Sequence, residues 1–440
     1  MEQPVTIQPW LDSLQLFGMK LGLDNMFLMN RLLGDPASRL KFVHVAGTNG
    51  KGSTCTYLAT AAKLCGLRTG LYTSPFLVDF HERCRIDGKP MPPDAFQRAI
   101  SKVMALEPEV VRISGVRPSY FEAITAAALL VFEEAGCQLV IWETGLGGRL
   151  DATNIVTPLL TVITNIGLDH MQYLGDTHAK IAAEKAGILK PGVPLVCGVN
   201  HAEARQVIHA RAAELGSDVR QLDRDFSLRR YRKGFGPDGF SQSLDFEGRA
   251  GRRQFAISMG GLHQLDNAAC AAAALEILAE QGLLPDLDRA FAALVHARLP
   301  GRLQVLEKGR LLVDGAHNAD GIQSLSRSLS DAFLGQKFHL VCGMMADKDL
   351  EALLAAIGPK AASLSCVGVN NPRALAPETF AERARAVLSC PVAAYPRWQD
   401  ALAVTLAKKD ALTLVFGSLY LVGEVLAGLA PESVNSDDLA

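Results

Sequence analysis

A glycine-rich loop is the feature of this sequence whose residue types point most directly to chemistry. A predicted strand, Lys41–Gly47, runs into the loop, and a predicted helix, Ser53–Cys65, follows it. This arrangement directs backbone N–H groups and the positive end of a helix at a phosphate group. Lys51 can reach the β and γ phosphates of a nucleotide, and the Ser53 hydroxyl can face Mg²⁺. The loop reads Gly47-Thr48-Asn49-Gly50-Lys51-Gly52-Ser53.

The loop departs from the standard phosphate-loop pattern at two positions. Val45 stands where the first glycine is usual, and Gly52 separates Lys51 from Ser53. The remaining glycines still let the backbone approach a ligand without an intervening Cβ. We therefore predict a variant phosphate loop that binds ATP, in preference to a glycine-rich turn without a ligand.

Three further residues with acid–base chemistry lie near the ends of predicted elements. Glu143 lies near the end of the apolar strand Leu139–Gly145, where a carboxylate without a partner would be costly. His170 comes just after the strand Leu159–Gly167, at the edge where open parallel sheets bind ligands. Lys185 lies in AAEKAGILK and, from residue types alone, is typical of a solvated helix. From residue types alone, Glu143 could be a functional carboxylate or one that only caps a loop. His170 could be a metal ligand or a buried, hydrogen-bonded imidazole.

These residues are expected on a parallel sheet, because short β-branched segments alternate with alanine-rich helical segments. Val193–Gly198 is a further predicted strand, and Phe121–Gly136 is a predicted helix. The alternation predicts a mostly parallel sheet with helices on its faces. Residues 223–261 differ, because glycines and a proline separate segments of period two, which predicts antiparallel hairpins. We interpret the arginines there as a solvated face rather than a site for an anionic partner.

A second alternating series follows the Pro300-Gly301 break. We therefore predict an α/β fold in two parts. Residues 1–297 form an N-terminal P-loop domain whose mostly parallel sheet has helices on both faces, with a hairpin insertion near residues 223–261. Residues 298–440 form a smaller C-terminal Rossmann-like α/β domain, and the last ten or so residues, PESVNSDDLA, are predicted to be disordered. The predicted strands of the second series are Arg310–Gly315, Lys337–Gly343, Ala362–Val369 and Leu412–Gly417.

Composition excludes several classes of protein. The 440 residues are 49% hydrophobic and 20% charged, with a formal net charge of -2, so a nucleic-acid partner is not expected. The nine cysteines are scattered without a CxxC pair, which argues against a zinc cluster or a disulfide framework. The N-terminus lacks the pattern of a signal peptide, and the apolar run Ala123–Phe132 is too short to span a membrane. We expect a cytoplasmic protein without a membrane partner.

Several ordered motifs resemble those of one protein family. The loop Gly47–Ser53 is similar to the nucleotide loop of the Mur ligase superfamily, whose members activate a carboxylate with ATP and couple it to an amine. The other motifs narrow the resemblance to the dihydrofolate synthase/folylpolyglutamate synthase family, over roughly residues 10–425. These motifs are TSPF at 73–76, HER at 81–83, SYFE at 119–122, ETGLGGRLDATN at 143–154, LDH at 168–170, EKAGI at 184–188, HQLDNA at 263–268, LPGR at 299–302, DGAHN at 314–318, DKD at 347–349 and GSLY at 417–420.

The resemblance implies an ATP-dependent ligase that forms C–N bonds. It would add L-glutamate to dihydropteroate and to the γ-carboxylate of tetrahydrofolates through an acyl phosphate. The family also implies Mg²⁺, with two ions expected, and a CO₂-derived carbamate on Lys185. The implied magnesium ligands are Ser74, Glu143, His170 and carbamylated Lys185, and the implied catalytic residues are Lys51, Glu143, His170 and Lys185. The small-molecule partners would be dihydropteroate, folates, L-glutamate and ATP, and we expect a monomer.

The resemblance also implies contacts with the nucleotide and the acceptor. Asn267 would face the base, Arg302 would pair with phosphate, Asp314 would accept from ribose hydroxyls, and His317 lies near enough in sequence to contribute. The position of the HERCR segment, rather than the resemblance, suggests that Arg83 could hold a glutamate carboxylate. The nucleotide would be gripped between the two domains, whose closure would assemble the site. The implied pterin or folate contacts are Ser119, Tyr120, Phe121, Glu122, Leu150, Asp151 and Ala152.

Other functions remain open at this stage. Leu150–Ala152 resembles the pterin segment of the dual enzymes, whereas TSPF and GSLY look closer to synthases that act only on folate. A muramyl ligase would need an additional N-terminal domain, for which the 46 residues before Gly47 leave no room. A regulatory P-loop ATP-binding protein would not need Glu143, His170 and Lys185. A dehydrogenase is discarded because no GxGxxG follows a strand.

Overall fold

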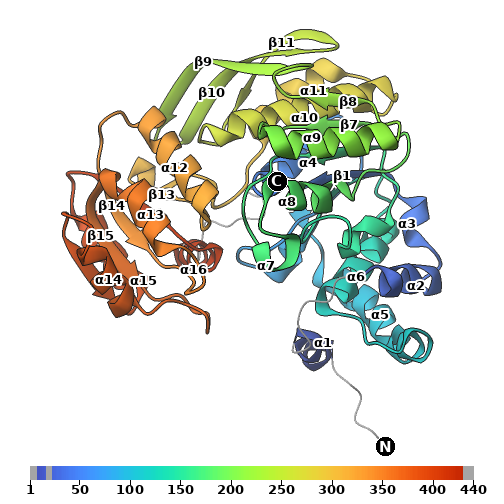
Figure 1. Cartoon of the computed structure of the whole chain (residues 1–440), viewed down its shortest axis with the longest axis horizontal. Coiled ribbons are helices and arrows are strands. Elements are labelled where there is room, and N and C mark those ends of the chain that lie inside the picture. Colours follow the sequence, from blue (N-terminus) through green and yellow to red (C-terminus); the bar gives the residue numbers. More distant parts are fainter. Residues whose placement is uncertain (1–6, 16–21, 430–440) are drawn as a thin grey trace, which may run out of the picture.

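The structure is a computed structural model that describes residues 7–15 and 22–429, and its larger sheet belongs to the N-terminal half (Figure 1). Six of its eight strands, β2, β5, β1, β6, β7 and β8, are parallel. The other two, β3 and β4, are antiparallel and lie at one edge. In spatial order the strands are β4 (Lys89–Pro90), β3 (Cys84–Ile86), β2 (Thr69–Tyr72), β5 (Leu139–Glu143), β1 (Phe42–Ala46), β6 (Leu160–Ile163), β7 (Leu195–Cys197) and β8 (Val219–Gln221).

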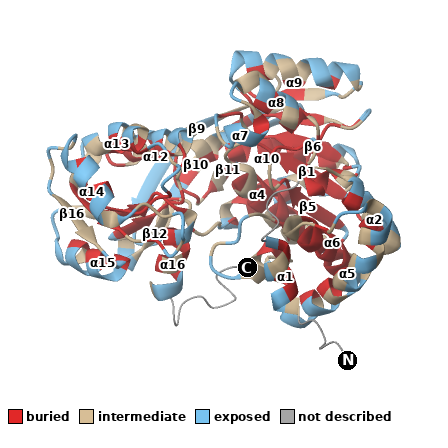
Figure 2. Ribbon diagram, turned by 60° about the horizontal axis from the view of Figure 1, so that its bottom comes forward, coloured by how far each residue is buried: buried red, intermediate tan, exposed pale blue. Residues whose placement is uncertain are grey.

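Helices cover both faces of this sheet, so the central strands β1 and β5 are buried along their whole length. Alternate side chains face opposite layers: Phe42 and Trp142 pack into one core, and Val43 and Ile141 into the other. Figure 2 shows the buried residues concentrated on the sheet and the helices against it. The first layer holds α1 (Ile7–Gln15), α2 (Asp24–Leu32), α3 (Pro36–Arg39), α5 (Pro93–Ser114) and α6 (Tyr120–Glu134), and the second α4 (Lys51–Leu64), α10 (His263–Glu280) and α11 (Leu287–Ala293).

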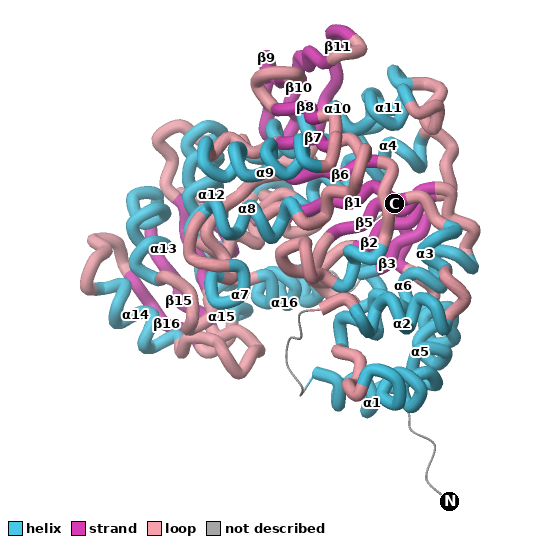
Figure 3. The backbone as a smooth tube through the Cα atoms, turned by 45° about the vertical axis from the view of Figure 1, so that its right-hand side comes forward, coloured by secondary structure: helices cyan, strands magenta, loops and turns pink. Residues whose placement is uncertain are grey.

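Two additions extend the N-terminal half. The short helix α7 (Met171–Leu174) and helices α8 (His178–Ala186) and α9 (Ala202–Glu214) pack at the β6–β8 end of the sheet. A separate antiparallel sheet of β9 (Ser227–Gly236), β10 (Gly239–Gly248) and β11 (Gly251–Ile257) packs on α10 (Figure 3). The prediction of hairpins within residues 223–261 is therefore confirmed.

The C-terminal half contains a six-stranded sheet in which only the edge strand β12 is antiparallel. One face carries α12 (Ala319–Ala332), α13 (Leu350–Ile357) and α14 (Pro377–Arg385), and the other carries α15 (Trp398–Ala407) and α16 (Leu419–Leu429). The predicted fold class is confirmed. In spatial order the strands are β12 (Gln304–Leu306), β13 (Leu311–Val313), β17 (Leu412–Phe416), β14 (Phe338–Cys342), β15 (Ala361–Val367) and β16 (Val392–Tyr395).

Two predictions about the chain are not decided by these residues. The division at residues 297 and 298 stays a prediction, and the disorder predicted for the last ten residues lies outside the described part of the chain. Within residues 7–15 and 22–429, no helix combines the length and the apolar character needed to cross a bilayer.

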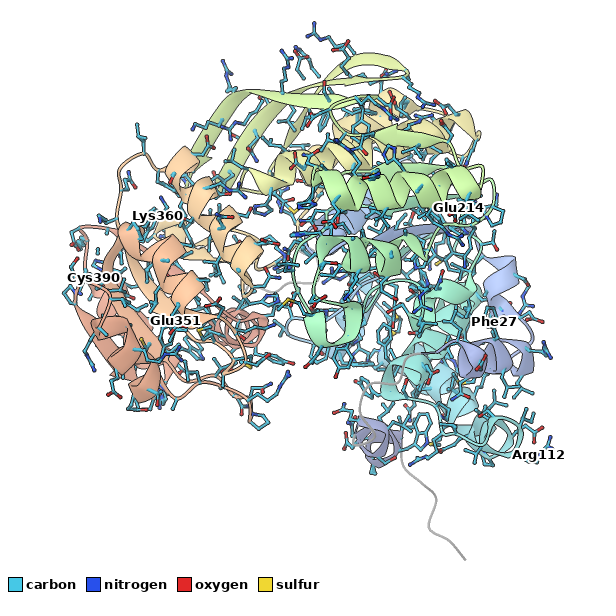
Figure 4. The ribbon with its side chains drawn as sticks, in the orientation of Figure 1. Phe27, Arg112, Glu214, Glu351, Lys360 and Cys390 are labelled. Carbon is cyan, nitrogen blue, oxygen red and sulfur yellow. The ribbon has the colours of Figure 1, made fainter. Side chains whose placement is uncertain are left out.

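The two halves meet at loops and at the β9–β10 hairpin, whose Phe240 packs against the core of the C-terminal half. Leu77, in the loop after β2, packs against the apolar cluster of α15 and α16. Arg230 on β9 forms an ion pair with Asp331 on α12 at 2.6 Å. Figure 4 shows its labelled residues on the outer surfaces of both halves, away from this junction.

Candidate active site

The phosphate loop is held so close to its neighbours that two of its positions require glycine. Gly47 has a φ of 153°, and a Cβ there would lie 1.9 Å from the Thr164 hydroxyl oxygen. Gly50 has a φ of 84°, and a Cβ there would lie 2.2 Å from Asn267 Oδ1. Helix α4 begins at Lys51, directly after Gly50. The loop therefore lies at a helix N-terminus with its backbone exposed to a ligand, as the sequence predicts.

Residues after β6 fix the conformation of this loop. The Thr164 hydroxyl donates to the Asn49 carbonyl at 2.7 Å, and the Asn49 N–H donates to Asn165 Oδ1 at 2.7 Å. Lys51 Nζ donates to the carbonyls of Gly47 at 3.0 Å and Thr48 at 3.1 Å. The ammonium group thus lies over the loop, where it can neutralise phosphate charge.

Helix α10 supplies a polar row beside the loop. Gln264 Nε2 donates to the Ser53 hydroxyl at 3.1 Å, and Asn267 Nδ2 donates to Gln264 Oε1 at 3.2 Å. All three side chains are buried. Gln264 thus links Ser53 to Asn267, a role that the sequence did not reveal.

Glu143 is a buried carboxylate at the end of β5. Its Oε2 accepts from the Ser74 N–H at 3.2 Å. Burial raises the Glu143 pKa to about 7, and the nearby cations Lys51 and Arg302 act only partly against that rise. The carboxylate is therefore short of the positive charge that would keep it ionised, as expected for a residue that binds a cation.

His170 lies after β6 in the left-handed backbone region, with a φ of 50°. Its neighbour Asp169 is contacted from the C-terminal half: Asn318 Nδ2 donates to Asp169 Oδ2 at 2.8 Å, and Lys348 Nζ lies 3.5 Å from Asp169 Oδ1. Asn318 Nδ2 also donates to Asn49 Oδ1 of the phosphate loop at 3.3 Å. The C-terminal half therefore bonds directly to the loop and to the residue before His170.

Lys185 is buried, contrary to the solvated helix position that its sequence alone favours. Its Nζ donates to the Gly47 carbonyl at 2.9 Å, so the side chain of α8 reaches the start of the phosphate loop. Burial, and then the like charge of Lys51, lowers the Lys185 pKa to about 7. At neutral pH a large fraction of this amine is therefore uncharged and nucleophilic.

The start of α6 forms an aromatic wall beside Glu143. The Phe121 ring is so close to Gly145 that a Cβ there would lie 2.5 Å from Phe121 Cζ. Ser119 and Glu122 form a capping box, in which each side chain accepts from the other's backbone N–H. Their expected contact with a pterin stays a prediction, because the structure shows their hydrogen bonds in local capping.

The loop after β5 is organised by Asp151. This buried carboxylate accepts from the Leu146 N–H at 2.7 Å and from the Thr153 N–H at 3.1 Å. These bonds fix the loop beside Phe121. Leu150 and Ala152, on either side of Asp151, line the same cavity.

Arg302, Asp314 and His317 approach from the C-terminal half. Asp314 accepts from the Leu303 and Ala316 N–H groups, each at 2.8 Å. His317 Nδ1 lies 2.8 Å from the Gly315 carbonyl, so Nδ1 carries the proton and Nε2 is left for other partners. Arg302 is close enough to Glu143 to oppose the rise of its pKa. Asp314 therefore shapes its own loop as well as facing the cavity.

One cavity of about 1480 Å³ brings together every site residue predicted from the sequence. Its lining includes the aromatic wall, Glu143 and the phosphate loop, together with residues of the C-terminal half. Within the described residues, no group of three or more His, Cys, Asp or Glu side chains gathers as a metal site. A cation here would need hydroxyl, water or modified-lysine ligands besides Glu143 and His170, which suits Mg²⁺.

Comparison with known proteins decides the family. Residues 95–275 match the model of the Mur ligase middle domain, and residues 301–419 match that of the Mur ligase glutamate ligase domain. A Bacillus subtilis protein named dihydrofolate synthase/folylpolyglutamate synthase is 32% identical over 425 residues, covering 94% of this chain and 96% of that protein. The chain belongs to the dihydrofolate synthase/folylpolyglutamate synthase family of Mur ligases. It is accordingly an ATP-dependent ligase that forms C–N bonds, as the sequence predicted.

Two further relatives of this ligase are informative. Folylpolyglutamate synthase from Lacticaseibacillus casei is 35% identical over 401 residues, covering 89% of this chain and 91% of that protein. The structure of Escherichia coli FolC in complex with DHPP and ADP has a TM-score of 0.84 and 28% identity, and covers 98% of this chain and 99% of that one. The ligase thus resembles both a protein named for the two synthase activities and a protein named for folylpolyglutamate synthase alone.

Several residues that build the ligase site were missed as candidates in the sequence. Thr164 and Asn165 were part of a predicted strand, whereas they follow β6 and hold the phosphate loop. Asp169, Asn318 and Lys348 lay inside family motifs but had no assigned role. Their position at strand ends was the available signal, because loops after parallel strands converge on one edge.

Proposed function

We propose that this ligase adds L-glutamate to dihydropteroate and to the γ-carboxylate of tetrahydrofolates. The observation that carries this proposal is a single cavity lined by the phosphate loop, by the two buried residues Glu143 and Lys185, and by the aromatic wall of Tyr120 and Phe121. The flat rings of Tyr120 and Phe121 suit a pterin or benzoyl ring. The names of the Bacillus subtilis and Lacticaseibacillus casei relatives support the same acceptors.

The proposed reaction has two steps. An acceptor carboxylate oxygen attacks the γ-phosphorus of ATP, ADP leaves, and an acyl phosphate forms. The neutral amine of glutamate then attacks the acyl carbon, an amide bond forms as the nitrogen loses one proton to solvent, and phosphate leaves with the oxygen that had bridged carbon and phosphorus. The loop N–H groups and Lys51 stabilise charge on the moving phosphoryl group, and Arg302 adds a second cation. The C-terminal half closes the cavity and limits access of water to the acyl phosphate.

Ser74, Glu143, His170 and carbamylated Lys185 would hold Mg²⁺, which when bound would neutralise phosphate charge. The fit rests on Glu143, whose carboxylate is buried with only partial compensation by cations and has a pKa of about 7. It rests equally on Lys185, whose lowered pKa leaves an amine able to add CO₂ with loss of a proton. Carbamylation would convert a buried cation into an oxygen anion suited to the same ion.

The nucleotide would lie between the halves. We assign the phosphates to Gly47–Ser53 and Arg302, the base to Asn267, and the ribose to Asp314 with His317 beside it. We further propose a cytoplasmic monomer whose partners are small molecules, without nucleic acid or membrane. The net charge of -2 supports the absence of a nucleic-acid partner.

A folylpolyglutamate synthase without the dihydropteroate activity is the second candidate. The observation in its favour is the 35% identity to the Lacticaseibacillus casei protein named for that activity alone. Purified protein should be given ATP, Mg²⁺, bicarbonate and L-glutamate with dihydropteroate and tetrahydrofolate in separate reactions. Amide product from both acceptors is expected, and product from tetrahydrofolate alone supports the second candidate. Unchanged ATP turnover in Glu143→Gln, with no amide in either protein, would instead identify a regulatory ATP-binding protein.

A further inference from the structure

Arg83 is a buried cation without an anionic partner in the wall of the cavity. The residue is 8% exposed, and its Nε and Nη1 atoms have no hydrogen-bond partner. Its guanidinium carbon lies 5.2 Å from the centre of the Phe76 ring and 5.9 Å from that of Phe80. No carboxylate of the described residues forms an ion pair with it. Because an uncompensated buried charge is costly, this arrangement indicates that a ligand supplies the anion.

The neighbouring Arg85 shows that the protein's own carboxylate here is already in use. Arg85 is equally buried and lies 3.7 Å from Glu82. Glu82 also accepts from the N–H groups of Leu77 at 3.1 Å and Asp79 at 3.0 Å. Glu82 therefore organises the loop after β2, and the two arginines have different tasks.

The position of Arg83 places its anion on the acceptor side of the cavity. The Arg83 carbonyl accepts from the Thr73 N–H at 2.9 Å, next to Ser74, which bonds to Glu143. Its guanidinium is close enough to Tyr120 to act against the rise of the tyrosine pKa that burial causes. Arg83 thus has its backbone beside the Ser74 segment and its guanidinium near the aromatic wall. Two further cations that line the cavity, Lys348 and Arg373, come from the C-terminal half.

We propose that Arg83 binds the α-carboxylate of the acceptor's terminal glutamate and is therefore needed for folate acceptors but not for dihydropteroate. This inference rests on the proposed function. A folate acceptor ends in two carboxylates: the γ-carboxylate must reach ATP, and the α-carboxylate must be held elsewhere. Dihydropteroate has a single carboxylate, which must stay free to react. The planar guanidinium fork suits such a bidentate carboxylate contact.

The test compares three acceptors: dihydropteroate, tetrahydrofolate, and tetrahydropteroyl-γ-aminobutyrate, which keeps the γ-carboxylate and lacks the α-carboxylate. The variants are Arg83→Gln, Arg83→Lys and the control Lys89→Gln, an exposed cation on β4. For the wild type, removing the α-carboxylate should raise KM about 10- to 100-fold, as expected for loss of a hydrogen-bonded ion pair. Arg83→Gln should raise the tetrahydrofolate KM by a similar factor and leave kcat, and both other acceptors, within about twofold.

Arg83→Lys should recover part of the tetrahydrofolate affinity, because it keeps the charge without the fork. The inference is overturned if the wild type ignores the α-carboxylate, if Arg83→Gln leaves the tetrahydrofolate KM unchanged, or if it impairs all three acceptors equally with an unchanged unfolding temperature. If Arg83→Gln lowers the unfolding temperature, Arg83→Lys is used in its place. Its KM values for the three acceptors, each divided by the wild-type value, are then judged by the same criteria. If the wild-type protein ligates none of the acceptors, the proposed function itself is rejected. The role of Arg83 is tested only when the wild-type protein is an active ligase, so the two failures can be told apart.

Discussion

The buried amine of Lys185 gives a quantitative prediction about CO₂. Its Nζ donates to the Gly47 carbonyl at 2.9 Å, and burial, followed by Lys51, lowers its pKa from 10.5 to about 7. At pH 7.5 about three quarters of such amines are neutral, against roughly one in a thousand for an exposed lysine. Only the neutral amine adds CO₂. From the ratio of these two fractions, Lys185 should form a carbamate roughly several hundred times more readily than an exposed lysine.

Removal of CO₂ and bicarbonate should therefore inhibit the ligase. We expect a fall in rate of at least about tenfold, the loss typical when a metal site loses a supporting group. The assay follows ADP release and amide formation together in CO₂-free buffer, before and after bicarbonate is added. Bicarbonate should restore the wild type but leave Lys185→Ala inactive. Lys180→Ala is the matched control, because Lys180 lies on the same helix, exposed and paired with Asp176 at 2.9 Å.

Two results would refute this reasoning about Lys185. One is a wild-type rate that does not respond to CO₂ removal. The other is a Lys185→Ala variant as active as Lys180→Ala. A ¹³C resonance from labelled bicarbonate that is present in the wild type and absent from Lys185→Ala would show the modification directly.

Three further predictions concern the same cavity. Because the Glu143 pKa is raised to about 7, protons compete with the cation below that pH, and Mg²⁺ affinity measured by calorimetry should fall up to about tenfold per pH unit; an affinity constant from pH 7 to 5.5 would contradict this. Asp169→Asn, which removes the anion facing Lys348, should lower kcat/KM about tenfold with nucleotide affinity nearly unchanged; full activity would show that this interdomain contact is dispensable. Gly50→Ala, whose Cβ would lie 2.2 Å from Asn267 Oδ1, should weaken ADP binding more than about tenfold in fluorescence titrations, whereas Gly66→Ala, with similar φ and open space, should not; equal effects would point to backbone strain alone.

Elements with strong local signals were predictable from the sequence. The strand, loop and helix around Lys51 follow from an apolar run, glycines and an alanine-rich segment in succession. The short strands β2, β3, β4, β8, β12 and β16 were not predicted, because two to four residues give no clear period and their pairing depends on other parts of the chain. β12 exists only because Gln304–Leu306 pairs with β13.

Long-range packing explains the rest of the difference between prediction and structure. Lys185 has the sequence context of an exposed helix residue, yet α8 packs so that its amine reaches Gly47. The bonds of Asp169 to Asn318 and Lys348 join segments nearly 150 residues or more apart, beyond any local pattern. Ser119 and Glu122 did have a local signal, since Ser-x-x-Glu before an apolar run is a capping box. Their contact with a pterin stays a prediction beside that capping role.

The central claim is that ATP phosphorylates the acceptor carboxylate before glutamate attacks, and an oxygen-transfer experiment tests it most directly. Dihydropteroate or tetrahydrofolate labelled with ¹⁸O in the reacting carboxylate is incubated with the ligase, ATP, Mg²⁺, bicarbonate and L-glutamate, and the released phosphate is analysed by mass spectrometry. The account predicts one ¹⁸O atom in each phosphate, in step with the new amide bond. Phosphate released without the label while the amide forms would contradict it.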